Sequence, residues 1–232
     1  MHYWNDDNFR GLTHLASELN KHANLQYLSE YCTLREKGLR KQALEKLDEF
    51  LHDSKQWDLT TKREMTVVIL RFNSRTPEAH QFITHPLLRD LINPTLDDWR
   101  EEDPNAIEPL RWIGLLRSDF DTLCLAIELK PSDISVRSKL INLLLDEVYF
   151  ATHHLNESVL LSNVEDIRET LKEAAKWIKP VHDHSPFKEL SQEVAFYKQL
   201  MDDWDLFNES SEQSFPLWCE LNGKSYEPTD IN

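Results

Sequence analysis

The chain has 232 residues, of which 40% are apolar and 29% charged, so it can bury a sizeable core in one large domain or two small ones. Only four glycines occur, and no glycine-rich phosphate-binding motif is present, which argues against nucleotide-binding loops and a turn-rich β-fold. The first residues lack the pattern of a secretory signal, and no apolar run approaches the ~20 residues of a membrane span. We therefore expect a cytoplasmic protein without a membrane partner.

The net charge of −15 is distributed unevenly along the chain. Residues 1–93 carry 13 basic and 13 acidic side chains, whereas residues 94–232 carry 13 basic and 28 acidic ones. Such a surface repels nucleic acid and attracts a basic protein, although acidity can also serve solubility alone. We expect one helical domain over residues 1–232, with two possible subdomains that meet between residues 93 and 94.

Helical periodicity begins near the N-terminus and predicts helices over residues 1–22, 24–36, 40–51 and 60–72. The last of these contains the β-branched run M-T-V-V-I-L, which is also compatible with a strand. We predict a helix there because both flanks are helical and no partner strand is visible.

Prolines divide the middle of the chain, and each is expected to mark a turn or the start of a helix. They are Pro77, Pro86, Pro94, Pro104 and Pro109. Thr95 and Asp98 have the spacing of a capping box before Trp99, so the acidic stretch 97–103 is predicted to be a loop or a first helical turn. Two further helices are predicted over residues 109–116 and 120–129.

The densest apolar segment, residues 133–155, is predicted to form the central helix. Two adjacent apolar stripes run along it, which makes an apolar face wider than a surface helix needs. They are Leu140, Leu144 and Val148, and Ile141, Leu145 and Tyr149. This helix should therefore have neighbours on more than one side, with Asp133 or Ser132 as its N-cap.

The C-terminal third predicts two more helices, one over 164–178 with Asn163 as its N-cap and one over 186–207. Apolar residues in the tail, from Phe215 to Leu221, indicate that it docks onto the body. No convincing strand signal occurs, so we predict an all-α fold: an irregular stack of antiparallel helical hairpins or a helical bundle.

Two stretches resemble tetratricopeptide-type repeats. The first match comprises Tyr27, Leu34, Gly38, Ala43 and Leu47, and the second comprises Phe120, Leu123, Ala126 and Pro131. The second hairpin is about a turn short, and no strict period of about 34 residues connects the two stretches. Members of this family are protein-binding scaffolds, so the resemblance implies stacked antiparallel helices and a binding role.

The segment around A-T-H-H-L, residues 151–155, is similar to a group of uncharacterised bacterial proteins. More loosely, the chain looks like the all-helical immunity proteins of bacterial contact-dependent growth inhibition systems. Such proteins are acidic and neutralise a basic toxin nuclease by occluding it.

Histidines and cysteines are the remaining candidates for chemistry. His153 and His154 follow the central helix, where histidine favours the negative end of the helix dipole, and neighbouring acids permit a hydrolase hypothesis. His182 and His184 form a bare H-x-H between two prolines, which is typical of a loop. The three cysteines lie in apolar patterns without a nucleophile signature. We predict no catalytic residue, no metal site and no cofactor.

The predicted partner-binding residues form two acidic clusters, each with a tryptophan among its carboxylates. They are Asp97, Asp98, Trp99, Glu101, Glu102 and Asp103, with Asp202, Asp203 and Asp205 extending the surface near Trp204. The leading hypothesis is a non-enzymatic immunity protein that blocks a basic toxin nuclease. The alternatives are a general cytosolic scaffold and, less favoured, a metal-dependent hydrolase.

Overall fold

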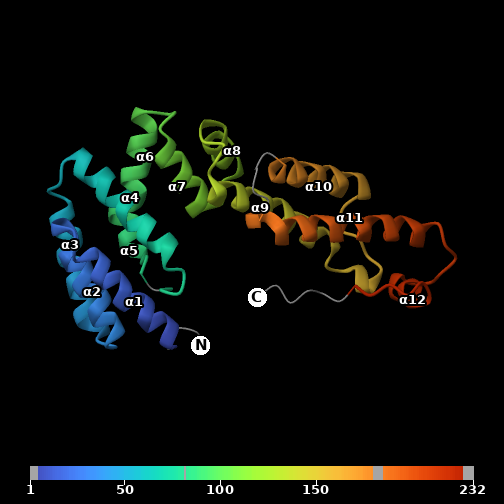
Figure 1. Cartoon of the computed structure of the whole chain (residues 1–232), viewed down its shortest axis with the longest axis horizontal. Helices are drawn as coiled ribbons and strands as arrows, with labels where there is room; N and C mark the ends of the chain where they lie inside the picture. Colours follow the sequence, from blue (N-terminus) through green and yellow to red (C-terminus); the bar gives the residue numbers. More distant parts are fainter. Residues whose placement is uncertain (1–4, 81, 180–184, 227–232) are drawn as a thin grey trace. The chain divides into compact units, whose positions relative to one another are not determined.

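The computed structural model describes residues 5–80, 82–179 and 185–226, and all regular structure within these ranges is helical (Figure 1). This confirms the predicted all-α class. The chain divides into two compact units, Met1–Ile113 and Gly114–Asn232. Unit 1 carries 15 basic and 19 acidic side chains and unit 2 carries 11 and 22, so most of the acidic excess lies in unit 2. We describe each unit by itself.

Unit 1 consists of consecutive helices joined by short connections. They are α1 (Asp6–Leu19), the 3-10 turn η1 (Ala23–Leu25), α2 (Gln26–Glu36), α3 (Arg40–Ser54), α4 (Leu59–Arg75), α5 (His85–Leu87), the π-helical turn η2 (Leu88–Ile92), α6 (Asn93–Glu102) and the start of α7 (Ile107–Arg117). α1 packs on α2 and α2 on α3, so the early helices form antiparallel hairpins. The β-branched run of residues 65–70 lies inside α4, as predicted.

The α5, η2 and α6 segments follow one another without a break, contrary to the expected helix start at Thr95. Pro94 has no N–H to donate to the carbonyl one turn before it. The π turn widens the helix at this point, and the Asn93 N–H bonds to the carbonyl of Leu88 instead. The helix begins at His85, and Thr84 caps it, since the Thr84 hydroxyl accepts a hydrogen bond from the Leu87 N–H at 3.3 Å, while Thr95 is buried mid-helix.

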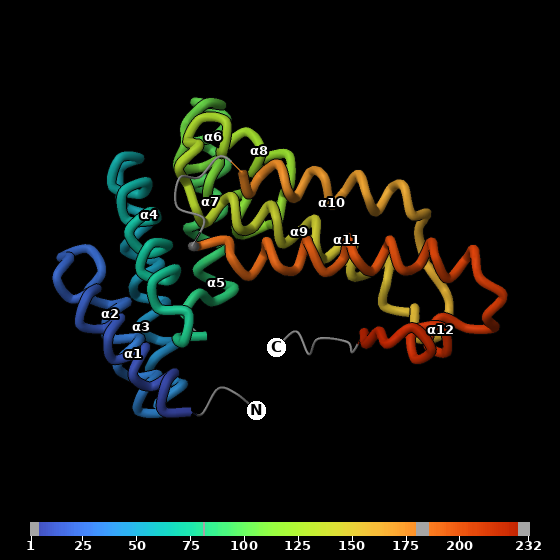
Figure 2. Tube along the Cα trace, turned by 45° about the vertical axis from the view of Figure 1, so that its right-hand side comes forward, coloured from blue at the N-terminus to red at the C-terminus, as the bar shows by residue number. Residues whose placement is uncertain are grey.

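Unit 2 is built around α9 (Ile134–Thr152), which packs against three other helices, α8, α10 and α11. Figures 1 and 2 both show α9, α10 and α11 running alongside one another. The remaining elements are α8 (Phe120–Leu129), η3 (Leu155–Glu157), α10 (Val164–Ile178), η4 (Ser185–Phe187), α11 (Lys188–Asn208) and α12 (Phe215–Leu221). α9 therefore has neighbours on more than one side, as its two apolar stripes predicted.

Local signals at the ends of α9 and α10 behave as the sequence predicts. Asp133 caps α9 by accepting a hydrogen bond from the Val136 N–H at 3.2 Å, and Asn163 caps α10 through the Asp166 N–H at 2.8 Å. Five of the six stripe residues of α9 are buried, whereas Tyr149 remains 45% exposed. In the tail, α12 buries Phe215 and leaves Leu221 exposed.

Arg137 is a buried cation near the start of α9, only 3% exposed. Its guanidinium donates to the carbonyl of Trp177 at 2.8 Å and to the carbonyl of Pro131. Trp177 lies in the last turn of α10, where unpaired carbonyls carry partial negative charge. Arg137 thus joins α9, the connection that precedes it and the end of α10.

Among the described residues, no helix has both the length and the apolar character that crossing a membrane requires.

Replacing Leu144 by alanine should be among the costlier single changes. Leu144 is 8% exposed within the core of unit 2, and such truncations cost ~2–5 kcal/mol because they leave a cavity. Phe150→Ala on the same helix is the matched control, since Phe150 is 68% exposed. Denaturant unfolding should show a large loss for Leu144→Ala and little change for Phe150→Ala. Equal stability of the two variants would contradict a core built around α9.

Candidate functional site

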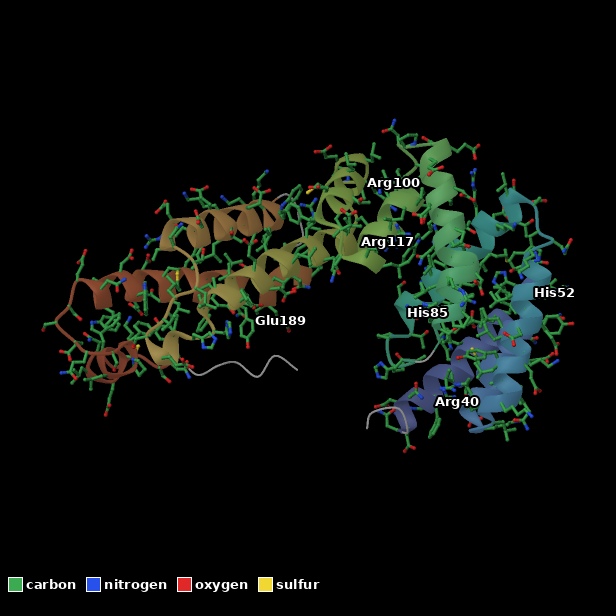
Figure 3. All side chains as sticks on the ribbon, turned by 180° about the vertical axis from the view of Figure 1, so that it is seen from behind. Arg40, His52, His85, Arg100, Arg117 and Glu189 are labelled. Atoms are coloured by element: carbon green, nitrogen blue, oxygen red, sulfur yellow. The ribbon has the colours of Figure 1, made fainter. Side chains whose placement is uncertain are left out.

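The first acidic cluster lies in the second half of α6 and just beyond it, not in a loop. Asp98, Glu101, Glu102 and Asp103 are exposed, and Asp97 is half-buried. Carboxylates near a helix C-terminus face the negative end of the helix dipole, which costs about 0.3–1 kcal/mol each at a surface. Arg100, labelled in Figure 3, is the one cation between residues 97 and 103. Within α6 itself these charges therefore do not stabilise the helix, and the cation that pairs with Glu102 comes from another helix, α4.

The ring of Trp99, which was predicted to bind a partner, is partly covered by another side chain of the same unit. The Arg63 guanidinium of α4 lies 5.1 Å from the centre of the Trp99 ring and also pairs with Glu102. The indole is half-buried as a result. Because Asp98, Glu101, Glu102 and Asp103 are exposed, the carboxylates are the more accessible part of this cluster.

The second cluster, in the last two turns of α11, departs from the prediction. Asp202 and Asp205 are surface residues, but both contact Arg168 of α10, at 3.0 and 2.7 Å. Asp203 is buried, with 1% of its surface exposed, and does not contribute to an acidic surface. Residues 202, 203 and 205 cannot share one helix face, because successive positions are turned by about 100°. This cluster belongs to unit 2 and the first to unit 1, so we treat them as separate surfaces.

Asp203 instead holds the C-terminal segment against α11. Its carboxylate accepts hydrogen bonds from the Tyr226 hydroxyl and from Gln199 at 3.1 Å, and it pairs with Lys224 at 3.1 Å. A buried carboxylate needs such partners to offset the loss of its hydration. Burial and the bond to Asp203 raise the pKa of the Tyr226 phenol, because both favour the protonated form.

The histidine pair lies where α9 ends. The Nδ1 of His153 donates to the Phe150 carbonyl at 2.7 Å, the predicted contact with the end of the helix. His154 lies beyond the helix, and its Nδ1 is 3.2 Å from Glu157. The centres of the two rings are 4.0 Å apart. In the described part of the chain, no three histidine, cysteine or carboxylate side chains are grouped to hold a metal. His182 and His184 lie outside that part.

The cysteines offer no activated thiol. Cys32 and Cys219 are buried, and Cys124 is partly so. Burial raises the pKa of all three, so the thiolate that a nucleophile requires is disfavoured.

Sequence reasoning missed a pocket of about 460 Å³ in unit 2, between α9, η3, α11 and the segment from α12 to Tyr226. Five aromatic side chains line it: Tyr149, Phe196, Tyr197, Phe215 and Tyr226. The Tyr226 ring lies 5.7 Å from Phe196 and 5.9 Å from Phe215, measured between centres. The one residue that the sequence analysis singled out among the lining residues of helix α9 is Tyr149, the last member of its second apolar stripe, which the core leaves exposed.

Asp203→Asn should weaken the attachment of the segment around Lys224 and Tyr226 to α11. Lys224 would lose its ion-pair partner, and the Tyr226 hydroxyl would lose its charged hydrogen-bond acceptor. A buried group left without a partner costs about 1–3 kcal/mol. An absorbance titration should show the Tyr226 phenol ionising at lower pH in the variant, since its pKa is raised in the parent. For the same reason the contribution of Tyr226 to stability is present below the ordinary phenol pKa and lost as pH rises through the raised value.

The neighbouring change Asp202→Asn is the control, because Asp202 is 64% exposed. It should shift the phenol titration much less than Asp203→Asn does, because Asp202 is the weakest of the causes that raise the pKa of Tyr226, and it should leave the unfolding midpoint nearly unchanged. Identical behaviour of the two variants would contradict the anchoring role of Asp203.

Comparison with known proteins identifies no relative: no protein-family model, no curated protein and no solved structure matches the chain.

Proposed function

We propose that the protein is a non-enzymatic binding protein that holds a basic protein through the carboxylates at the end of α6. The observation that carries the proposal is the exposure of Asp98, Glu101 and Glu102 in the second half of α6, where the helix dipole opposes the two glutamates of the last turn. Lysine and arginine side chains of a partner would relieve this repulsion and also interact favourably with the helix end. Part of the binding free energy would then come from removing the unfavourable interaction between these carboxylates and the helix end.

The most specific form of the proposal is an immunity protein that neutralises a basic toxin nuclease. The residues from Asp97 to Asp103 would compete with nucleic-acid phosphates for the cations of the nuclease and would occlude its active site. The helical fold and the net charge of −15 support this form, as does the loose likeness to immunity proteins of contact-dependent growth inhibition systems. In this mechanism the protein acts by steric and electrostatic means and needs no catalytic group.

A general scaffold of the tetratricopeptide type is the second candidate. The observation that favours it is the consecutive packing of α1, α2 and α3 as antiparallel neighbours. A scaffold would hold a peptide through apolar contacts and backbone hydrogen bonds, so its affinity would depend weakly on salt. The salt dependence of binding therefore separates the two candidates.

Replacing Asp98, Glu101 and Glu102 together by lysine should weaken binding by tenfold or more, since close interfacial charge pairs are coupled by ~1.5–7 kcal/mol. The partner for this titration is the protein that co-purifies with the chain from its native host. The association rate of the parent should fall steeply with added salt, and that of the variant should not. If the partner is a toxin, the variant should also fail to protect cells.

The matched control replaces Glu165, Glu169 and Glu173 of α10 by lysine, which changes the net charge equally. It should reduce the association rate modestly and leave the dissociation rate unchanged, because long-range attraction acts mainly on encounter. The α6 variant should unfold cooperatively with a stability close to that of the parent, because lysine suits a helix C-terminus while Glu102→Lys removes the exposed ion pair with Arg63. Unchanged affinity and salt dependence in the α6 variant would contradict the proposal.

A further inference from the structure

The aromatic pocket of unit 2 is a second place where a ligand can bind, and it does not depend on the α6 surface. Its volume of about 460 Å³ lies within the range of small-molecule sites, ~300–1,000 Å³. Tyr197 and Phe215 in its wall are buried, whereas Tyr149 is 45% exposed and stands toward solvent. The pocket therefore combines fixed walls with an accessible side.

One carboxylate lines this pocket and two more lie close to its tyrosines, against a single lysine in the lining. Glu220 lines the pocket and is exposed, and its side chain forms no ion pair with any residue in the described part of the chain. Asp146 and Glu193 each lie about one helical turn from a lining tyrosine, Tyr149 and Tyr197 respectively. Burial is the main cause that raises the pKa of Tyr197 to about 12, and Glu193, Tyr149 and Asp146 raise it further. The aromatic walls thus lie in a negative local potential.

The basic side chains of the lining do not balance these charges. Lys224 is already paired with the buried Asp203 at 3.1 Å. His153 donates its Nδ1 proton to the Phe150 carbonyl and stacks beside Tyr149, with ring centres 5.9 Å apart. An anionic ligand would have to compete with Asp203 for Lys224, whereas a cation meets no such competition.

From the aromatic walls and the surrounding carboxylates, we propose that this pocket binds an organic ammonium group. The faces of tyrosine and phenylalanine rings attract a cation, and the attraction grows where water is excluded. Alkyl substituents on the nitrogen lower its hydration and allow it to pack against the rings, while Glu220 supplies the opposite charge. Both a free small amine and an alkylated lysine side chain present this group.

Three probes of nearly equal shape and different charge test the proposal on the full chain. Choline carries a trimethylammonium group, 3,3-dimethyl-1-butanol replaces that nitrogen by carbon, and 3,3-dimethylbutyrate is an anion of similar size. Titration calorimetry should show choline binding about tenfold or more tightly than the neutral alcohol, and the butyrate more weakly still. The choline methyl protons should shift upfield in the NMR spectrum, as expected beside aromatic faces.

Two pairs of matched variants connect binding to this pocket. Tyr149→Leu removes an exposed lining ring, and Phe150→Leu removes the adjacent ring, which does not line the pocket. Glu220→Gln removes the lining charge, and Glu209→Gln removes a comparable exposed charge elsewhere on unit 2. The first member of each pair should weaken choline binding severalfold, and the second should leave it unchanged.

A peptide with one trimethyllysine and otherwise uncharged residues distinguishes the two sources of the ammonium group. Tighter binding of the peptide assigns the group to a polypeptide, and tighter binding of choline assigns it to a free amine. Equal binding of choline and its neutral analogue would overturn the proposal, because charge would then play no part. Preferential binding of the butyrate, or no binding of any probe, would overturn it as well.

Discussion

The apolar face of α9 is the constraint on which unit 2 depends. One helix cannot expose stripes as wide as those of residues 140–148, so α8, α10 and α11 must cover it. Arg137 joins the start of α9 to the end of α10 through backbone carbonyls. Because the inward faces are taken up by this core, the acidic side chains of α10 and α11 lie mostly outside it. The packing around α9 thus places the apolar side chains of α10 and α11 inside and most of their acidic side chains on the surface.

Charge placement distinguishes the two acidic clusters that the sequence predicts. On α11, Asp202 and Asp205 contact Arg168, and Asp203 holds Lys224 and Tyr226, so these carboxylates have structural partners. On α6, Asp98 and Glu101 are exposed, Glu101 lies in the last turn where the helix dipole disfavours it, and Glu102 pairs with Arg63. A surface that costs the unbound chain stability is the better candidate for an interface, since stability and function are often in conflict at binding sites. The same separation leaves the aromatic pocket as an independent feature of unit 2.

Local patterns predicted most of the fold. The 3.6-residue period located the long helices, and the caps Asp133 and Asn163 were readable because their hydrogen bonds span three residues. The π turn before Pro94 could not be predicted from the sequence. A proline shows that one helical hydrogen bond is missing, but it does not show how the helix adjusts to that loss. The burial of Asp203 depends on Tyr226, which is 23 residues away, and the pocket joins segments still farther apart. Periodicity within one helix carries no information about such pairings.

Carboxylate labelling of the free and partner-bound protein tests the central claim most directly. A carbodiimide with a small amine modifies exposed carboxylates, and mass spectrometry reads the extent of modification peptide by peptide. If the end of α6 forms the interface, labelling of Asp98, Glu101 and Glu102 should fall sharply in the complex, while that of Glu165 and Glu169 on α10 stays the same. Equal labelling of the α6 carboxylates in both states would contradict the account.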